Sequence, residues 1–220
     1  MEPSKVMHSH GIVCKTLAFP INPSDVNQIQ GVYTSPVHKK EVDGFVPGIE
    51  GVFKVVAVGK EVTEVKLHDI VLPKVPNLGT WRQELVCDAK DVFTIPEMPI
   101  VMASVLTVNI CTAYRLIHDF HKKGGVVVQN GGTSQVALYV SQLCKAYNIP
   151  CVSVVRRSDK NVAAVAEIEK WNVCFYEDEM RDENVVEIIK KMGRIQLLLN
   201  CVGGKRCVLC YIVLPLIICK

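Results

Sequence analysis

The chain has 220 residues, of which 49% are hydrophobic and 21% are charged, so it carries enough apolar material for a buried core and is not a disordered segment. Its formal net charge is only +3, and its Lys and Arg residues are dispersed along the chain. This charge pattern excludes an electrostatic case for nucleic-acid binding, and the length allows one or two domains.

Ten cysteines are scattered through the chain, most of them in segments predicted to be apolar strands and helices. Because no secretory signal precedes them, we expect reduced, buried thiols in an intracellular compartment rather than a disulfide framework. The one CxxC pair, Cys207 and Cys210, lies in an apolar run without a second pair or nearby histidines. Zinc or redox chemistry is therefore not expected at that pair.

Neither end of the chain predicts a membrane span. Residues 1–10 show neither the apolar core of a secretion signal nor the Arg-rich amphipathic pattern of mitochondrial import. Residues 208–219 are apolar but are broken by Pro215, and they are fewer than the roughly 20 residues needed to cross a bilayer. From the residues alone we expect no targeting sequence, and a strand rather than an anchor at the carboxyl end.

Residues 1–99 are predicted to form the first domain, an irregular all-β unit. Short apolar runs with a period of two alternate there with frequent Pro and Gly, which is typical of strands bounded by turns. The expected strands cover residues 51–59, 69–73, 81–86 and 92–96. A small barrel-like fold fits these strands.

Residues 100–220 change to helical spacing and predict an α/β domain. A strand, turn, helix and second strand are expected within residues 126–157, and further strands at residues 173–176 and 195–200. Helices are expected at residues 101–106, 109–121, 162–170 and 184–191. The four strands should be parallel and form half or more of a doubly wound sheet, with ligands at their carboxyl ends.

The turn after the first of these strands predicts a phosphate site. Gly131 and Gly132 permit a tight turn into a helix, whose amides and positive dipole end suit the pyrophosphate of a dinucleotide. The pattern departs from the G-x-G-x-x-G/A fingerprint because the two glycines are adjacent, Gln135 follows them, and Ala137 is the small residue available for packing. A plain connection between strand and helix is the alternative.

The second strand of this unit ends in Arg156-Arg157-Ser158. An acidic residue about 20 positions after the turn holds the ribose 2′-hydroxyl of NAD, whereas an Arg there accommodates the 2′-phosphate of NADP. Two cations and a hydroxyl therefore favour NADP(H). A solvated basic loop is the alternative.

Several segments share a pattern with one known family. They are residues 19–33 (FPINPSDVNQIQGVY), 48–52 (GIEGV), 79–82 (GTWR), 108–115 (VNICTAYR), 128–130 (VQN), 154–156 (VVR) and 199–205 (LNCVGGK). Together they resemble the zinc-free medium-chain dehydrogenase/reductases, and within them the mitochondrial trans-2-enoyl-CoA reductases. Asn-Pro-Ser-Asp alone marks only the broad superfamily, whereas Tyr33 and the Gly-Thr-Trp-Arg turn point to the enoyl reductases.

The resemblance implies a GroES-like irregular β-barrel domain for substrate at residues 1–99 and a partial Rossmann domain that binds NADPH at residues 100–220. It also implies the NADPH-dependent reduction of trans-2-enoyl thioesters, carried by CoA or by acyl carrier protein, in mitochondrial fatty acid synthesis. A related quinone or enone reductase and a catalytically inactive member of the family are the alternatives.

The family's functional positions map onto residues of this sequence. By resemblance, Tyr33 donates a hydrogen bond to the thioester carbonyl and assists proton delivery, with a surface-loop tyrosine as the alternative. Asn109 contacts the cofactor, and it is also a candidate helix N-cap. The other implied cofactor-binding residues are Thr133, Ser134, Gln135, Val136, Arg156, Arg157 and Ser158. No metal is expected, because Gly48-Ile49-Glu50 stands where zinc members place Gly-His-Glu.

The family pattern also has departures. Gln135 and Ala137 stand where the family has glycine, so we expect weaker pyrophosphate binding. The resemblance stops after Lys205, from which we expect a truncated chain of poor activity, and a homodimer if a second copy completes the sheet edge. The family implies a mitochondrial location, and the cytosol is the alternative because the residues predict no presequence.

Overall fold

The computed structural model describes residues 8–32, 46–76 and 78–202, and it divides into two compact units, Met1–Val108 and Asn109–Lys220. The division falls after Val108 because the helical segment that follows Pro99 packs on the first unit, where Ala103 and Leu106 join one apolar cluster with its strands. The expected domain limits, 1–99 and 100–220, stay predictions.

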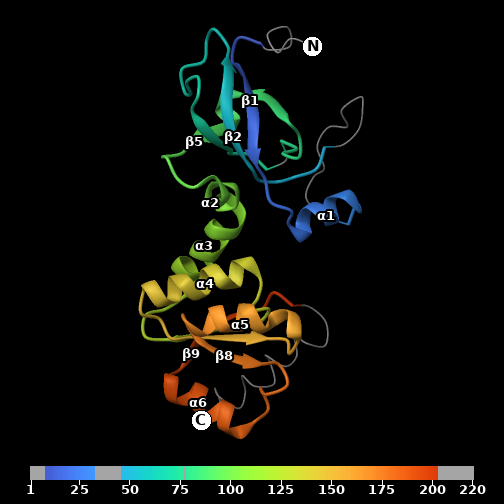
Figure 1. Ribbon diagram of the computed structural model, residues 1–220. Coiled ribbons are helices and arrows are strands. Elements are labelled where there is room, and N and C mark those ends of the chain that lie inside the picture. Colours follow the sequence, from blue (N-terminus) through green and yellow to red (C-terminus); the bar gives the residue numbers. More distant parts are fainter. Residues whose placement is uncertain (1–7, 33–45, 77, 203–220) are drawn as a thin grey trace. The chain divides into compact units, whose positions relative to one another are not determined.

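The first unit is built on a five-stranded antiparallel sheet (Figure 1). Its strands are β1 (Gly11–Ala18), β2 (Val52–Val58), β3 (Ile70–Pro73), β4 (Glu84–Asp88) and β5 (Val92–Thr94), in the spatial order β4-β1-β2-β3-β5. The four expected strands are confirmed, with small shifts at their ends. Strand β1 was not among them, and its register with β2 slips twice, which bends the sheet around its apolar cluster.

Short helices accompany this sheet. They are α1 (Pro23–Ile29), a 3₁₀ turn (Ala89–Asp91), α2 (Ile100–Ser104) and a π-helical turn (Leu106–Ile110). Helix α1 starts at Asn22-Pro23 because proline suits the first helical position and the carboxylate of Asp25 accepts a hydrogen bond from the Asn22 amide at 2.8 Å. The sequence pattern did not predict α1.

The second unit contains a four-stranded sheet in which every pairing is parallel, as predicted. Its strands are β6 (Val126–Gln129), β7 (Cys151–Val155), β8 (Val173–Tyr176) and β9 (Ile195–Leu199), in the order β8-β7-β6-β9. The helices are α3 (Cys111–Phe120), α4 (Gln135–Ala146), α5 (Val162–Glu169) and α6 (Glu183–Met192), with a 3₁₀ turn (Asp159–Asn161).

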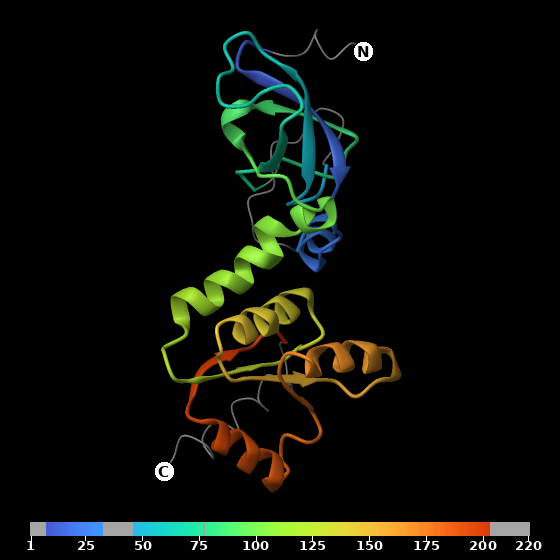
Figure 2. The same cartoon turned by 60° about the vertical axis from the view of Figure 1, so that its left-hand side comes forward.

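Helices cover both faces of this parallel sheet (Figures 1 and 2). Helices α3 and α4 pack on the face that carries Val127 and Cys151, and α5 packs beside them around Val155. Helix α6 packs on the opposite face, against Val126 and Val152. Burial on both faces explains the continuous valine runs of β6 and β7, and the predicted doubly wound architecture is confirmed.

The described cysteines are free thiols that differ in exposure. Cys14, Cys144 and Cys151 are buried, as predicted, whereas Cys111 and Cys201 are exposed, so the expectation of buried thiols is wrong for those two. Cys111 lies on the face of α3 away from its buried residues Ala113 and Ile117, and Cys201 follows the end of β9. The predicted CxxC pair and the apolar run around Pro215 lie outside the described residues. Within the ranges that the structure describes, no helix is long and apolar enough to cross a bilayer.

Candidate functional site

The second unit contains a topological switch point between β6 and β9. The chain passes from β6 to β7 and β8 on one side and later returns to β9 on the other side of β6. In open α/β sheets the crevice outside the carboxyl ends of such strands is where ligands bind. A cavity of about 300 Å³ opens here. Its lining residues include Asn130, Ser134, Val136, Leu198, Asn200 and Cys201.

The turn that follows β6 brings its backbone close to the residues that end β7 and follow β9. Gly131 adopts a φ of +60°, and a Cβ there would lie 2.6 Å from Sγ of Cys201. A Cβ on Gly132 would lie 2.9 Å from Cγ1 of Val155, and the Gly132 amide donates to the carbonyl of Val154 at 3.0 Å. Both positions therefore require glycine, as the sequence indicated for a tight turn.

The turn delivers the chain to the amino end of α4. Ser134 caps this helix, because its hydroxyl accepts a hydrogen bond from the Ala137 amide at 3.3 Å. Ser134 and Gln135 are exposed, whereas Thr133 and Val136 are half-buried. Helix geometry directs the amides of the first turn outward at the positive end of the dipole, so this cradle fits a pyrophosphate.

Two polar residues at the end of β6 shape the cavity and were not among the predicted site residues. The Asn130 side-chain amide donates to the Asn200 side-chain oxygen at 2.6 Å, and its own oxygen accepts from the Cys201 amide at 2.8 Å. Gln129 is buried, with its amide nitrogen within 3.0 Å of Oγ of Ser141. The Gln-Asn pair that follows three consecutive valines was the signal in the sequence.

The predicted 2′-phosphate residues follow β7 at the same edge of the sheet, but the two arginines have different surroundings. Arg157 Nε donates to Asp178 at 3.0 Å, Arg157 Nη2 donates to Glu179 at 2.7 Å, and its guanidinium lies 3.9 Å from the ring centre of Tyr176. The hydrogen bond to Asp178 is the main cause that raises the pKa of Arg157 and lowers that of Asp178. Arg157 therefore joins the ends of β7 and β8.

Arg156 is exposed, and the carbonyl of Arg156 accepts a hydrogen bond from the Asn161 side chain at 2.8 Å, which fixes the backbone at this point. The Ser158 hydroxyl accepts from the Lys160 amide at 3.3 Å, as the cap of the 3₁₀ turn. Of the two predicted arginines, Arg157 is thus paired with carboxylates, whereas Arg156 is exposed and forms no ion pair with the residues that the structure describes.

Asn109 is buried within the π-helical turn that precedes α3. The N-cap of α3 is Ile110, so the alternative interpretation of Asn109 as a helix N-cap is wrong. The reason is that the chain is already helical through residues 106–110, which leaves no extended residue before Cys111. π-helical turns occur frequently at functional sites.

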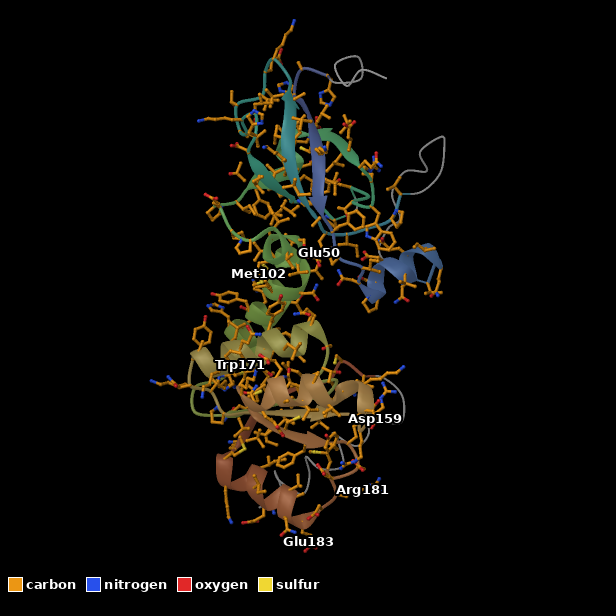
Figure 3. The ribbon with its side chains drawn as sticks, in the orientation of Figure 1. Glu50, Met102, Asp159, Trp171, Arg181 and Glu183 are labelled. Atoms are coloured by element: carbon orange, nitrogen blue, oxygen red, sulfur yellow. The ribbon has the colours of Figure 1, made fainter. Side chains whose placement is uncertain are left out.

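In the first unit a buried carboxylate organises the segments around α1 (Figure 3). Glu50 is 1% exposed and accepts hydrogen bonds from the Asn22 side chain at 2.8 Å, the Val108 amide at 2.9 Å and the Thr107 hydroxyl at 3.2 Å. It thereby joins the start of α1 to the π-helical turn. Both carboxylate oxygens of Glu50, the acidic residue of Gly48-Ile49-Glu50, thus accept hydrogen bonds from protein donors.

A second buried carboxylate, Asp25, also links α1 to the segment before β2. Asp25 of α1 accepts from the Ile49 amide at 3.2 Å as well as from Asn22. Burial raises the pKa of Asp25, and the two backbone hydrogen bonds oppose that rise. Tyr33, the predicted catalytic residue, lies outside the described residues, as does Lys205. The described chain fixes α1, which ends four positions before Tyr33 in the sequence.

Known proteins share this architecture and sequence. Residues 8–97 match the alcohol dehydrogenase GroES-like domain family. A solved complex of Etr1p with NADP and crotonyl-CoA superposes with a TM-score of 0.85 and 31% identity, over 94% of this chain and 64% of that one. The mitochondrial enoyl-[acyl-carrier-protein] reductase of Kluyveromyces lactis is 40% identical over 215 residues, which are 89% of this chain and 56% of that protein.

Sequence and fold thus both support the resemblance to the medium-chain dehydrogenase/reductases, and among them to the mitochondrial enoyl-thioester reductases. A further relative, an NADPH quinone oxidoreductase of Kluyveromyces marxianus, is 35% identical over 214 residues, 89% of this chain and 56% of that protein. The chain thus spans about half the length of the curated relatives it matches. The fold predicted from the sequence is the one that these similar proteins share.

Proposed function

We propose that this chain takes part in the NADPH-dependent reduction of trans-2-enoyl thioesters to acyl thioesters. The observation that carries the proposal is the cavity at the switch point, which is lined by Asn130, just before the glycine turn, and by Ser134 and Val136 at the start of α4. The same sheet edge carries Arg156 after β7. The likeness to a complex that holds NADP and crotonyl-CoA supports this assignment of cofactor and substrate class.

The proposed cofactor contacts lie at different positions along this sheet edge. The first-turn amides of α4, at Gln135 and Val136, would hold the pyrophosphate, and Arg156 would hold the 2′-phosphate. Apolar walls of the cavity, among them Val140 and Leu198, would exclude water from the nicotinamide end. When bound, NADPH supplies the hydride that reduces the β-carbon of the enoyl thioester.

Tyr33 is the proposed acid and oxyanion donor. Its phenol would donate a hydrogen bond to the thioester carbonyl oxygen as negative charge develops there, and it would assist proton delivery to the α-carbon. The described residues support this role indirectly: α1 is anchored by Asp25 and by the bond of Asn22 to Glu50. Asn109 would contact the cofactor from the π-helical turn.

Arg156 and Arg157 provide the test of the cofactor. We expect Arg156→Ala to weaken NADPH binding by about tenfold, the scale of one charge-assisted hydrogen bond, and to leave NADH binding unchanged. Arg157→Ala is the matched control, because its charge is opposed by Asp178 and Glu179. It should affect the two cofactors equally. Titration of the purified chain with each cofactor measures this, and equal affinity of the wild type for both cofactors would contradict NADPH selectivity.

Tyr33→Phe provides the test of the chemistry. Turnover of crotonyl-CoA should fall by roughly a hundredfold while NADPH affinity stays the same, as expected for the loss of one acid or oxyanion donor. A quinone reductase is the second candidate, favoured by the Kluyveromyces marxianus relative. NADPH oxidation with benzoquinone but not with crotonyl-CoA would select that candidate. The mitochondrial names of the relatives support a mitochondrial location, which imaging of the tagged full chain can test.

A further inference from the structure

Another cavity, of about 430 Å³, opens in the second unit at the amino ends of its strands. The turns before β7 and β8 meet here, and Cys151 and Val173, the first residues of those strands, line the cavity. In Figure 3 Trp171, which also lines it, lies at one end of the parallel strands, and Asp159, which follows the carboxyl end of β7, lies at the other. The cavity therefore has no part in the function proposed above.

Two side chains of this lining carry buried donors that meet no acceptor. The ring nitrogen Nε1 of Trp171 and the side-chain nitrogen Nδ2 of Asn172 are buried, and neither has a hydrogen-bond partner among residues 8–32, 46–76 and 78–202. Their backbone amides both donate to the Ile168 carbonyl at 2.9 Å, which holds the segment in place. Buried donors of this kind nearly always have an acceptor. The cavity that both residues line is where a ligand oxygen can reach them.

The charges around the cavity balance one another. Lys145 and Lys170 are the cations of the lining and Glu169 is its anion, and Lys170 also pairs with Glu167 at 2.6 Å. Helices α4 and α5 both end here, so the negative ends of their dipoles offset further positive charge. The lining therefore selects neither an anion nor a cation, and it suits a neutral ligand.

The rest of the lining is largely apolar. Ile149, Pro150 and Met192 contribute to it beside the polar groups. Ile149 is fixed because its amide donates to the Cys144 carbonyl at 2.8 Å. Apolar walls with a few convergent polar groups are typical of sites for small molecules. The ligand should therefore carry a compact apolar body.

We propose that this cavity binds a neutral carboxamide with a compact apolar body. A carbonyl oxygen has two lone pairs, so one such oxygen can accept from both Trp171 Nε1 and Asn172 Nδ2. The amide N–H of the ligand can donate to the carboxylate of Glu169, which also lines the cavity. A carboxylate ligand would place a second negative charge beside Glu169, and an ammonium ligand would offer the two buried donors no acceptor.

Three probes of one shape test the charge and the acceptor separately. Cyclohexanecarboxamide is neutral, cyclohexanecarboxylate is the matching anion, and cyclohexylmethylammonium is the matching cation. The chain has two tryptophans, Trp81 and Trp171, so the indole N–H resonance of Trp171 can be assigned with a Trp81→Phe variant and followed by NMR. The carboxamide should shift this resonance downfield until it saturates, and it should bind about fivefold or more tightly than either charged probe. Excess NADPH should not displace it.

Asn172→Leu removes one donor and keeps the approximate size of the side chain. It should weaken carboxamide binding by about fivefold, the scale of one neutral hydrogen bond. It should not lower the urea midpoint of the free chain, because the Nδ2 group that it removes has no partner in the described fold. Lys145→Gln should change carboxamide binding by less than about twofold, since the ligand carries no charge. Asn184→Ala, an exposed asparagine of α6 that does not line the cavity, is the matched control and should change neither quantity.

Several results would overturn the inference. Tighter binding of the carboxylate than of the carboxamide would mean that the site selects an anion. Carboxamide binding that leaves the Trp171 resonance unmoved, that NADPH abolishes, or that Asn172→Leu does not weaken would place the probe elsewhere. A lower urea midpoint for Asn172→Leu would mean that the Asn172 amide holds the fold, and the absence of saturable binding would mean that solvent water alone serves the two donors.

Discussion

The two units stabilise their functional ends by different means. In the first unit a buried carboxylate, Glu50, joins segments that are 28 and 58 residues away in the sequence. In the second unit the turn after β6 is held by a neutral amide, Asn130, and by glycines whose backbone lies close to neighbouring segments of the same chain. A buried charge destabilises the fold when one of its hydrogen-bond partners is removed. A closely packed turn is destabilised instead by steric overlap, when a side-chain atom is added.

The comparison predicts its largest effect at Glu50. Glu50→Ala leaves the Asn22 amide and the Val108 N–H without their acceptor, and it should destabilise the first unit by about 3 to 5 kcal/mol. Urea unfolding measures this through Trp81, in a Trp171→Phe background that removes the tryptophan of the second unit. Glu50→Gln, which keeps one acceptor oxygen, should cost less. A loss equal to that of Glu50→Ala would mean that the charge, and not the hydrogen bonding, holds the segments.

A substitution at Gly131 tests whether the turn after β6 requires glycine. Gly131→Ala combines a φ of +60° with a Cβ that would lie 2.6 Å from a sulfur atom, so we expect a loss of about 2 to 3 kcal/mol and weaker NADPH binding. Gly124→Ala is the matched control, because its φ is +84° but nothing lies within 4 Å of the added atom. It should cost about 1 kcal/mol. Equal losses would show that conformation alone, and not close approach, requires glycine in the turn.

The smallest expected effect is on the free energy of unfolding, whose dependence on pH should have opposite signs for the contributions of Asp25 and Asp178. Burial raises the pKa of Asp25, so its contribution to stability is present below the usual aspartate pKa of about 3.9 and is lost as the pH rises through the folded value. The hydrogen bond from Arg157 lowers the pKa of Asp178, so that contribution is present above the usual value and is lost as the pH falls.

Unfolding of Asp25→Asn and Asp178→Asn between pH 3 and pH 6 measures both slopes against the wild type. Relative to its variant, the wild type should lose stability with rising pH in the first case and gain it in the second. Slopes of the same sign would contradict the assignment of burial as the dominant cause at Asp25.

Much of the second unit could be predicted from the sequence because its signals are local. Continuous valines at 126–128 indicate a strand buried on both faces, and the glycine pair after it indicates the turn into a helix. The first unit was harder. Strand β1 lacks strict alternation because its register slips, and α1 is only seven residues long, so that neither gave a clear periodic signal.

For the second unit, the sequence by itself determined the order of the elements, the parallel sheet and the place of the turn before α4, since each follows from residues a few positions apart. Only the tertiary structure decided which polar groups meet. Arg157 pairs with carboxylates 21 and 22 residues later, and Asn130 bonds to residues 70 and 71 positions away. Such partners are set by strand order and by the way the helices pack, so spacing along the chain cannot specify them.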